Sequence, residues 1–103
     1  MGIFLVRAVK VENGEVEAAH VSGIGTMSGE PETFAVDDGR ILGRADLASL
    51  VIVEDVYVAT IPVAGEFGLG SRVQRKPGSM EYLTSVGDDG TPNSDLHDLP
   101  KLT

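Results

Sequence analysis

Oxygen-bearing side chains are concentrated near the C-terminus of the chain. Asp88, Asp89, Asn93, Asp95 and Asp98 lie within eleven residues, and carboxylate and amide oxygens bind divalent cations. The spacing does not match an EF-hand loop, which needs alternating ligands, a central glycine and a distal glutamate. Asp and Asn beside Gly and Pro also form ordinary turns. We therefore expect turns here and keep a metal site of Asp88, Asp89, Asp95 and Asp98 as the alternative.

Positive charge is concentrated in one short segment, where Arg72, Arg75 and Lys76 supply three of the eight basic residues. In a strand, Arg72, Gln74 and Lys76 share one face because successive side chains alternate. Such a face binds an anion or an acidic partner, or it protects an edge strand against aggregation. We favour edge protection and name Arg72, Gln74 and Lys76 as the binding residues if the strand has a partner.

The remaining reactive residues do not form a catalytic motif. The chain has no cysteine and two histidines, His20 and His97, whereas catalytic zinc normally takes three protein ligands. No Gly-x-Ser-x-Gly nucleophile elbow is present. The glycines Gly65, Gly68 and Gly70 precede a predicted strand, and a phosphate loop requires a helix at that place. We therefore predict a protein without enzymatic activity and without a cofactor.

The charge balance limits the classes of partner. Eight Lys and Arg against sixteen Asp and Glu give a net charge of −8, which repels nucleic acids and anionic membranes. No apolar run approaches the roughly 20 residues that span a bilayer, and the first residues lack the basic region of a signal peptide. Without cysteine there are no disulfides. We expect a cytoplasmic protein that binds neither nucleic acid nor membranes.

Alternating apolar residues and turn signals predict the secondary structure. Asn13-Gly14 is the strongest hairpin signal, because a type I′ turn needs positive φ at both central positions. We predict one short helix over 44–52, where Leu47, Leu50 and Val51 are spaced for one helical face. Glycine-rich loops are expected at 23–32 and 64–70. The expected strands are 3–11, 15–22, 33–36, 56–63, 71–76 and 80–86.

The first strand is apolar on both faces, which is typical of a central strand. Ile3, Leu5, Val9 and Val11 are expected on one face, and Phe4, Val6 and Ala8 on the other. The alternation becomes unclear after Ala18-Ala19, where we expect a β-bulge.

The predicted fold class is α+β and β-rich. Five or six mostly antiparallel strands form a curled sheet or partial barrel with one short helix. Residues 1–103 form a single domain with its core at about 3–86. The tail 87–103 is mostly irregular, with Leu96 and Leu99 spaced to dock one turn against the sheet.

The C-terminal segment resembles the closing signature of the bacterial domain-of-unknown-function family 3892. That signature has a Tyr-Leu-Arg-Thr strand, an Asp-Gly-Thr turn and an Asn-Leu-x-x-Leu-Pro tail. The matching residues are Tyr82-Leu83-Thr84-Ser85, Asp88-Asp89-Gly90-Thr91, Asn93 and Leu96-His97-Asp98-Leu99-Pro100. Thr84 replaces the usual Arg, and Asp95-Leu96 replaces Asn-Leu. The resemblance implies a similar order of elements over residues 3–100, including the helix at Arg44-Ala45-Asp46-Leu47, and implies no activity, cofactor or substrate.

These observations favour a small non-enzymatic binding module that acts through protein contacts or self-association, with its sheet edges as the contact surface. Tyr57 and Tyr82 either line a concave face or lie in the core, and we favour the core. The alternative is a small-ligand or metal-binding regulatory domain that uses the 88–98 tail, with the 64–70 loop as a lid. Reversing Arg72 and Lys76 to Glu is expected to abolish partner binding and preserve the fold.

Overall fold

Eight strands and one helix make up the computed structural model, which describes residues 3–28, 33–36, 38–60, 69–79 and 82–102. This confirms a β-rich α+β chain with one helix. The elements are β1 (Ile3–Glu12), β2 (Glu15–Ser28), β3 (Thr33–Val36), β4 (Arg40–Gly43), α1 (Arg44–Val53), β5 (Asp55–Ala59), β6 (Leu69–Arg75), β7 (Leu83–Val86) and β8 (Pro92–Asn93). The predicted number of strands is too low because β4 and β8 are too short to show a clear alternation.

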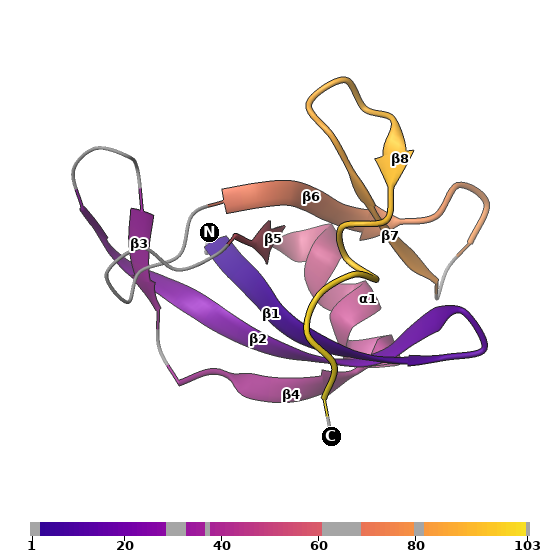
Figure 1. Cartoon of the computed structure of the whole chain (residues 1–103), viewed down its shortest axis with the longest axis horizontal. Coiled ribbons are helices and arrows are strands. Elements are labelled where there is room, and N and C mark those ends of the chain that lie inside the picture. The colour runs from indigo at the N-terminus through magenta and orange to yellow at the C-terminus, as the bar shows by residue number, and fades with distance from the viewer. Residues whose placement is uncertain (1–2, 29–32, 37, 61–68, 80–81, 103) are drawn as a thin grey trace.

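The strands form one open sheet in the order β3-β2-β1-β5-β6-β7-β8, and β4 also pairs with β2 (Figure 1). Neighbouring strands are antiparallel except for β1 and β5, which are parallel over Ile3–Val6 and Asp55–Val58. The sheet is therefore mixed. The segment β4-α1-β5 is a crossover that carries the chain over β2 and β1 to reach the far side of β1.

The hairpin between β1 and β2 turns at Asn13 and Gly14, which have φ values of 53° and 79°. This confirms the predicted turn. The pairing shifts twice. Arg7 is an extra residue in β1, and Glu17 is an extra residue in β2. The bulge in β2 lies next to Ala18, close to the place where the sequence predicted one.

The two bulges decide which side chains reach the core. Val6, Val9 and Val11 all pack in the main hydrophobic cluster, although strict alternation would put Val6 on the opposite face from the other two. The predicted faces of the first strand are therefore wrong beyond Val6. Each bulge adds one residue and reverses the alternation that follows it.

Strand β2 is longer than predicted and continues through Gly23 to Ser28. The expected loop at 23–32 is therefore wrong for its first six residues, and the other four lie outside the described residues. Strands β3 and β4 both pair antiparallel with β2, one after the other along its length. They are separated near Gly39, which has a φ of 71°, and a Cβ there would lie 2.5 Å from the carbonyl oxygen of Val21.

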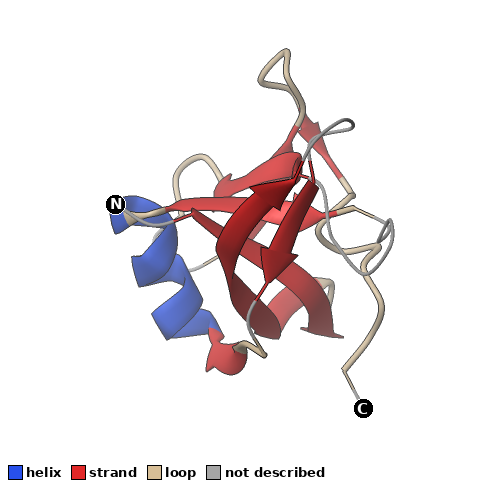
Figure 2. Ribbon diagram, turned by 90° about the vertical axis from the view of Figure 1, so that its left-hand side faces the viewer, coloured by secondary structure: helices blue, strands red, loops and turns tan. Residues whose placement is uncertain are grey.

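Helix α1 covers one face of the sheet (Figure 2). It begins and ends within one residue of the predicted range, and Leu47 and Ala48 are buried against the strands. Leu50 and Val51 are partly buried against the same cluster. The predicted helix at 44–52 is therefore confirmed.

The C-terminal tail is part of the core. Leu96 is fully buried and Leu99 is nearly so, which confirms the predicted docking. The backbone N–H of Val9 donates to the carbonyl of Pro100 at 2.9 Å, and the N–H of Leu102 donates to the carbonyl of Val9 at 2.8 Å. The tail therefore runs beside β1 where β5 no longer accompanies it.

We expect Leu96→Ala to lower the free energy of unfolding by about 2–4 kcal/mol, because it leaves a cavity in a packed core. The control is Leu69→Ala, since the Leu69 side chain is 37% exposed. Urea denaturation followed by circular dichroism measures both variants. Equal losses for the two variants would contradict the docking of the tail.

Candidate functional site

The basic segment lies inside the sheet. Strand β6 pairs with β5 on one side and with β7 on the other. The prediction that this segment is a protected edge strand is therefore wrong. Its composition is like that of an edge strand because Arg72 and Gln74 are exposed on an open face of the sheet. Composition alone does not show which strands pair with it on either side.

The positive charges of this segment are bound within the molecule. Arg72 donates to Asp55 at 2.8 Å, and its guanidinium lies 5.9 Å from the centre of the Tyr57 ring. Lys76, just beyond β6, donates to Glu15 at 2.7 Å. Reversing Arg72 and Lys76 to Glu would therefore set like charges against Asp55 and Glu15, so it is a poor test of partner binding.

Three of the aspartates considered as alternative metal ligands, Asp89, Asp95 and Asp98, accept hydrogen bonds within the chain. Asp89 accepts the backbone N–H of Thr91 at 2.9 Å in the turn between β7 and β8, and this bond lowers its pKa below the ordinary value. Asp98 accepts the hydroxyl of Ser94 at 2.8 Å. In the described part of the chain, no three His, Asp or Glu side chains are grouped to hold a metal ion. The alternative set of Asp88, Asp89, Asp95 and Asp98 is therefore not among the groupings found in the described residues.

The two histidines and the two tyrosines have structural contacts. The Nε2 of His20 donates to the backbone carbonyl of Asp38 at 2.8 Å and links β2 to the start of β4. The backbone carbonyl of His97 accepts a hydrogen bond from the Lys101 ammonium. Tyr82 is 38% exposed, with the Arg44 guanidinium 5.1 Å from its ring centre. Tyr57 is half-buried, so the expectation that both tyrosines lie in the core is wrong.

A chain of hydrogen bonds that the sequence did not reveal holds the tail against β6 and β7. The buried Ser85 hydroxyl donates to the Asn93 side-chain oxygen at 2.5 Å and accepts the Leu96 N–H at 2.9 Å. The Asn93 amide donates to Ser71 at 3.1 Å, and Ser71 donates to Asp95 at 2.6 Å. This network fixes the position of the Asp95 carboxylate.

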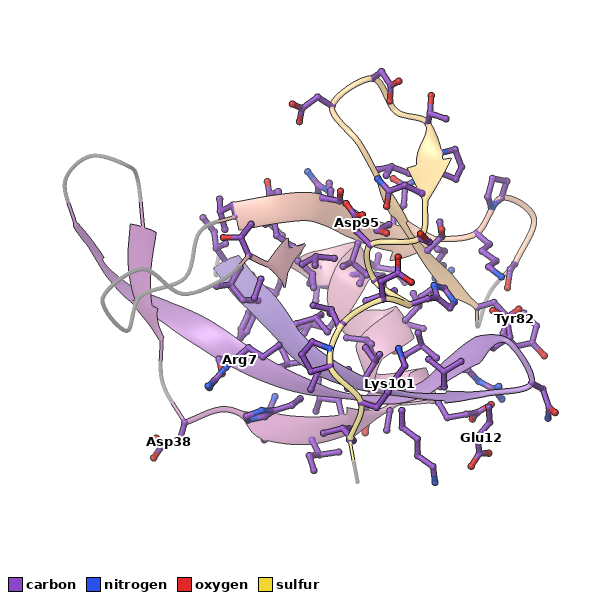
Figure 3. The ribbon with its side chains drawn as sticks, viewed as in Figure 1. Arg7, Glu12, Asp38, Tyr82, Asp95 and Lys101 are labelled. Atoms are coloured by element: carbon purple, nitrogen blue, oxygen red, sulfur yellow. The ribbon has the colours of Figure 1, made fainter. Side chains whose placement is uncertain are left out.

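An open pocket of about 760 Å³ lies where β1 and β5 separate, and we call it the fork pocket. Val58, Ala59, Leu99 and Pro100 supply its apolar wall, while Arg7, Ser71, Asp95 and Asp98 are among its polar residues. Figure 3 shows Arg7 and Asp95 on different elements, β1 and the tail. Gly70 is required in this wall, because a Cβ would lie 2.7 Å from the carbonyl oxygen of Val58.

A second candidate surface lies between β4 and α1, and we call it the β4–α1 surface. It consists of a groove lined by Arg40, Leu42, Leu50 and Val53, with Ile41 and Ile52 on the same two elements. Ile41, Ile52 and Val53 are 65%, 60% and 65% exposed. Among the described strands, none pairs with the side of β4 that faces away from β2.

Most of the 64–70 segment, expected as a lid, lies outside the described residues. No described helix is long and apolar enough to span a membrane. No protein-family model matches the chain, and comparison with the curated proteins and with the solved structures finds no match. The resemblance to the bacterial family stays a prediction.

We expect Lys76→Glu to lower the melting temperature and Glu15→Lys in the same chain to restore it. The Lys76 and Glu15 side chains are 37% and 22% exposed, so the pair is worth about 1 kcal/mol or less. Thermal unfolding of the two single variants and the double variant measures the coupling. Purely additive losses would contradict an ion pair in solution.

Proposed function

We propose that the protein is a non-enzymatic binding module of the cytoplasm that acts through protein contacts at the β4–α1 surface. The observation that supports this is the outer side of β4, along which none of the described strands pairs and on which the Ile41 side chain is exposed. An edge strand without a neighbour accepts a strand from a partner, and adjacent apolar side chains add burial to the backbone hydrogen bonds.

The distribution of exposed side chains supports this surface over the basic segment. Three of the most exposed large apolar residues in the described chain belong to β4 and α1, whereas Arg72 and Lys76 have acidic partners of their own. A contact at β4 would gain about 25 cal/mol of free energy for each Å² of apolar surface that it buries. The acidic and cysteine-free composition agrees with a reducing compartment.

We expect Ile41→Lys to abolish the capture of a protein partner from a lysate of the native host while leaving the fold intact, because Ile41 is exposed. The control is Leu69→Lys, which places the same charge on β6. Quantitative mass spectrometry of the captured proteins compares the two variants. A partner held equally by both variants would contradict a site at β4.

The fork pocket supports a second candidate, a small-ligand regulatory domain. Its volume is within the range of about 300–1,000 Å³ that is usual for small-molecule sites. Arg7 offers a positive group to a carboxylate, and Asp95 and Asp98 offer negative groups to an amine. With an apolar wall between them, these groups suit a short dipolar molecule such as a dipeptide with free termini.

We expect dipeptides with free termini to raise the melting temperature, and dipeptides with blocked termini to leave it unchanged. A ligand at a hundredfold excess over its dissociation constant adds about 2.7 kcal/mol. Asp98→Asn is expected to weaken the effect and Asp88→Asn to preserve it, since Asp98 lines the pocket. Equal shifts with free and blocked peptides would reject recognition by charge.

A further inference from the structure

The outer edge of β4 can pair with itself. An antiparallel arrangement centred on Ile41 places Ile41 opposite its own copy, Arg40 opposite Leu42, and Gly39 opposite Gly43. Opposed residues of an antiparallel pair lie on the same face with Cα atoms about 4.5–5.5 Å apart. The two exposed Ile41 side chains would therefore cover one another.

Gly43 is the N-cap residue of α1, a position at which glycine is common. A Cβ added to it would meet no atom within 4 Å, and its φ of −73° with ψ of 169° is a conformation that any residue adopts. By contrast, Gly39 has a φ of 71° and no room for a side chain.

The charges along this edge suit an antiparallel copy. Asp38 precedes β4 and Arg44 follows it, so Asp38 of one copy would lie opposite Arg44 of the other, and Arg44 also pairs with Glu17 of its own chain. Asp38, Arg40, Arg44 and Asp46 sum to zero over 38–46, while the whole chain carries −8. Two copies therefore approach at this edge without the repulsion that opposes contact between acidic surfaces elsewhere.

We propose that the partner bound at the β4–α1 surface is a second copy of this chain, held by antiparallel pairing of β4 about a two-fold axis at Ile41. This inference rests on the proposed function and names its partner. The interface is isologous, so the same residues face each other from both copies.

Sedimentation velocity across a range of protein concentrations tests the proposal. We expect a dimer for the natural sequence and for Leu69→Lys. Ile41→Lys is expected to raise the dissociation constant by at least about tenfold, because it sets two ammonium groups opposite each other.

Cysteine cross-linking tests the register. The chain contains no cysteine, so Ile41→Cys introduces a single thiol at the expected axis. Strand spacing there is within the Cα separation of about 4.4–6.8 Å that a disulfide requires. We expect mild oxidation to give a covalent dimer for Ile41→Cys and little for Ile52→Cys, the control of similar exposure.

Each outcome decides the proposal. A monomer at about 1 mM protein, a dimer unaffected by Ile41→Lys, or equal cross-linking of the two cysteine variants would overturn it. A monomer that still captures a different protein, in a manner abolished by Ile41→Lys, would overturn self-association and leave the proposed function in place. Circular dichroism of each variant separates loss of contact from loss of fold.

Discussion

The backbone hydrogen bonds at Val9 are the contacts on which much of the molecule depends. Strand β5 accompanies β1 only to Val6, and a buried strand leaves no N–H or C=O without a partner. Pro100 and Leu102 provide these partners. With the tail held there, Leu96 and Leu99 enter the core, Asp95 is positioned by Ser71, and the space between the separating strands becomes the fork pocket.

The second constraint is the pair of bulges in the first hairpin. Arg7 and Glu17 are charged residues, and each is the extra residue at its bulge. Because a bulge reverses the alternation, the residues on both sides of it continue to reach one core. Arg7 thereby lines the fork pocket, and Glu17 meets Arg44 at 3.0 Å at the start of α1.

The polar and apolar surfaces have different roles. Two basic side chains of the β6 segment form ion pairs within the chain, Arg72 with Asp55 and Lys76 with Glu15. The exposed apolar residues Ile41, Ile52 and Val53 gather on two adjacent elements. We therefore place the proposed protein contact at the outer edge of β4 and not on the basic strand. This edge arises because the crossover from β4 through α1 to β5 leaves β4 outside β2.

Local sequence determined the features that depend on a few neighbouring residues. The turn at Asn13-Gly14 follows from its need for positive φ, and the helix follows from the spacing of Leu47, Leu50 and Val51. Only the tertiary structure decided the parallel pairing of β1 with β5, the interior place of β6 and the edge position of β4. These depend on contacts between residues far apart in the chain, as do the Ser71–Asp95 bond and the fork pocket. Periodicity reports the face of a strand and not its neighbours, so it misplaced the basic strand at an edge. Nearness in sequence was an equally incomplete guide, because Asp95 and Asp98 line one pocket while Asp89 lies in the turn between β7 and β8.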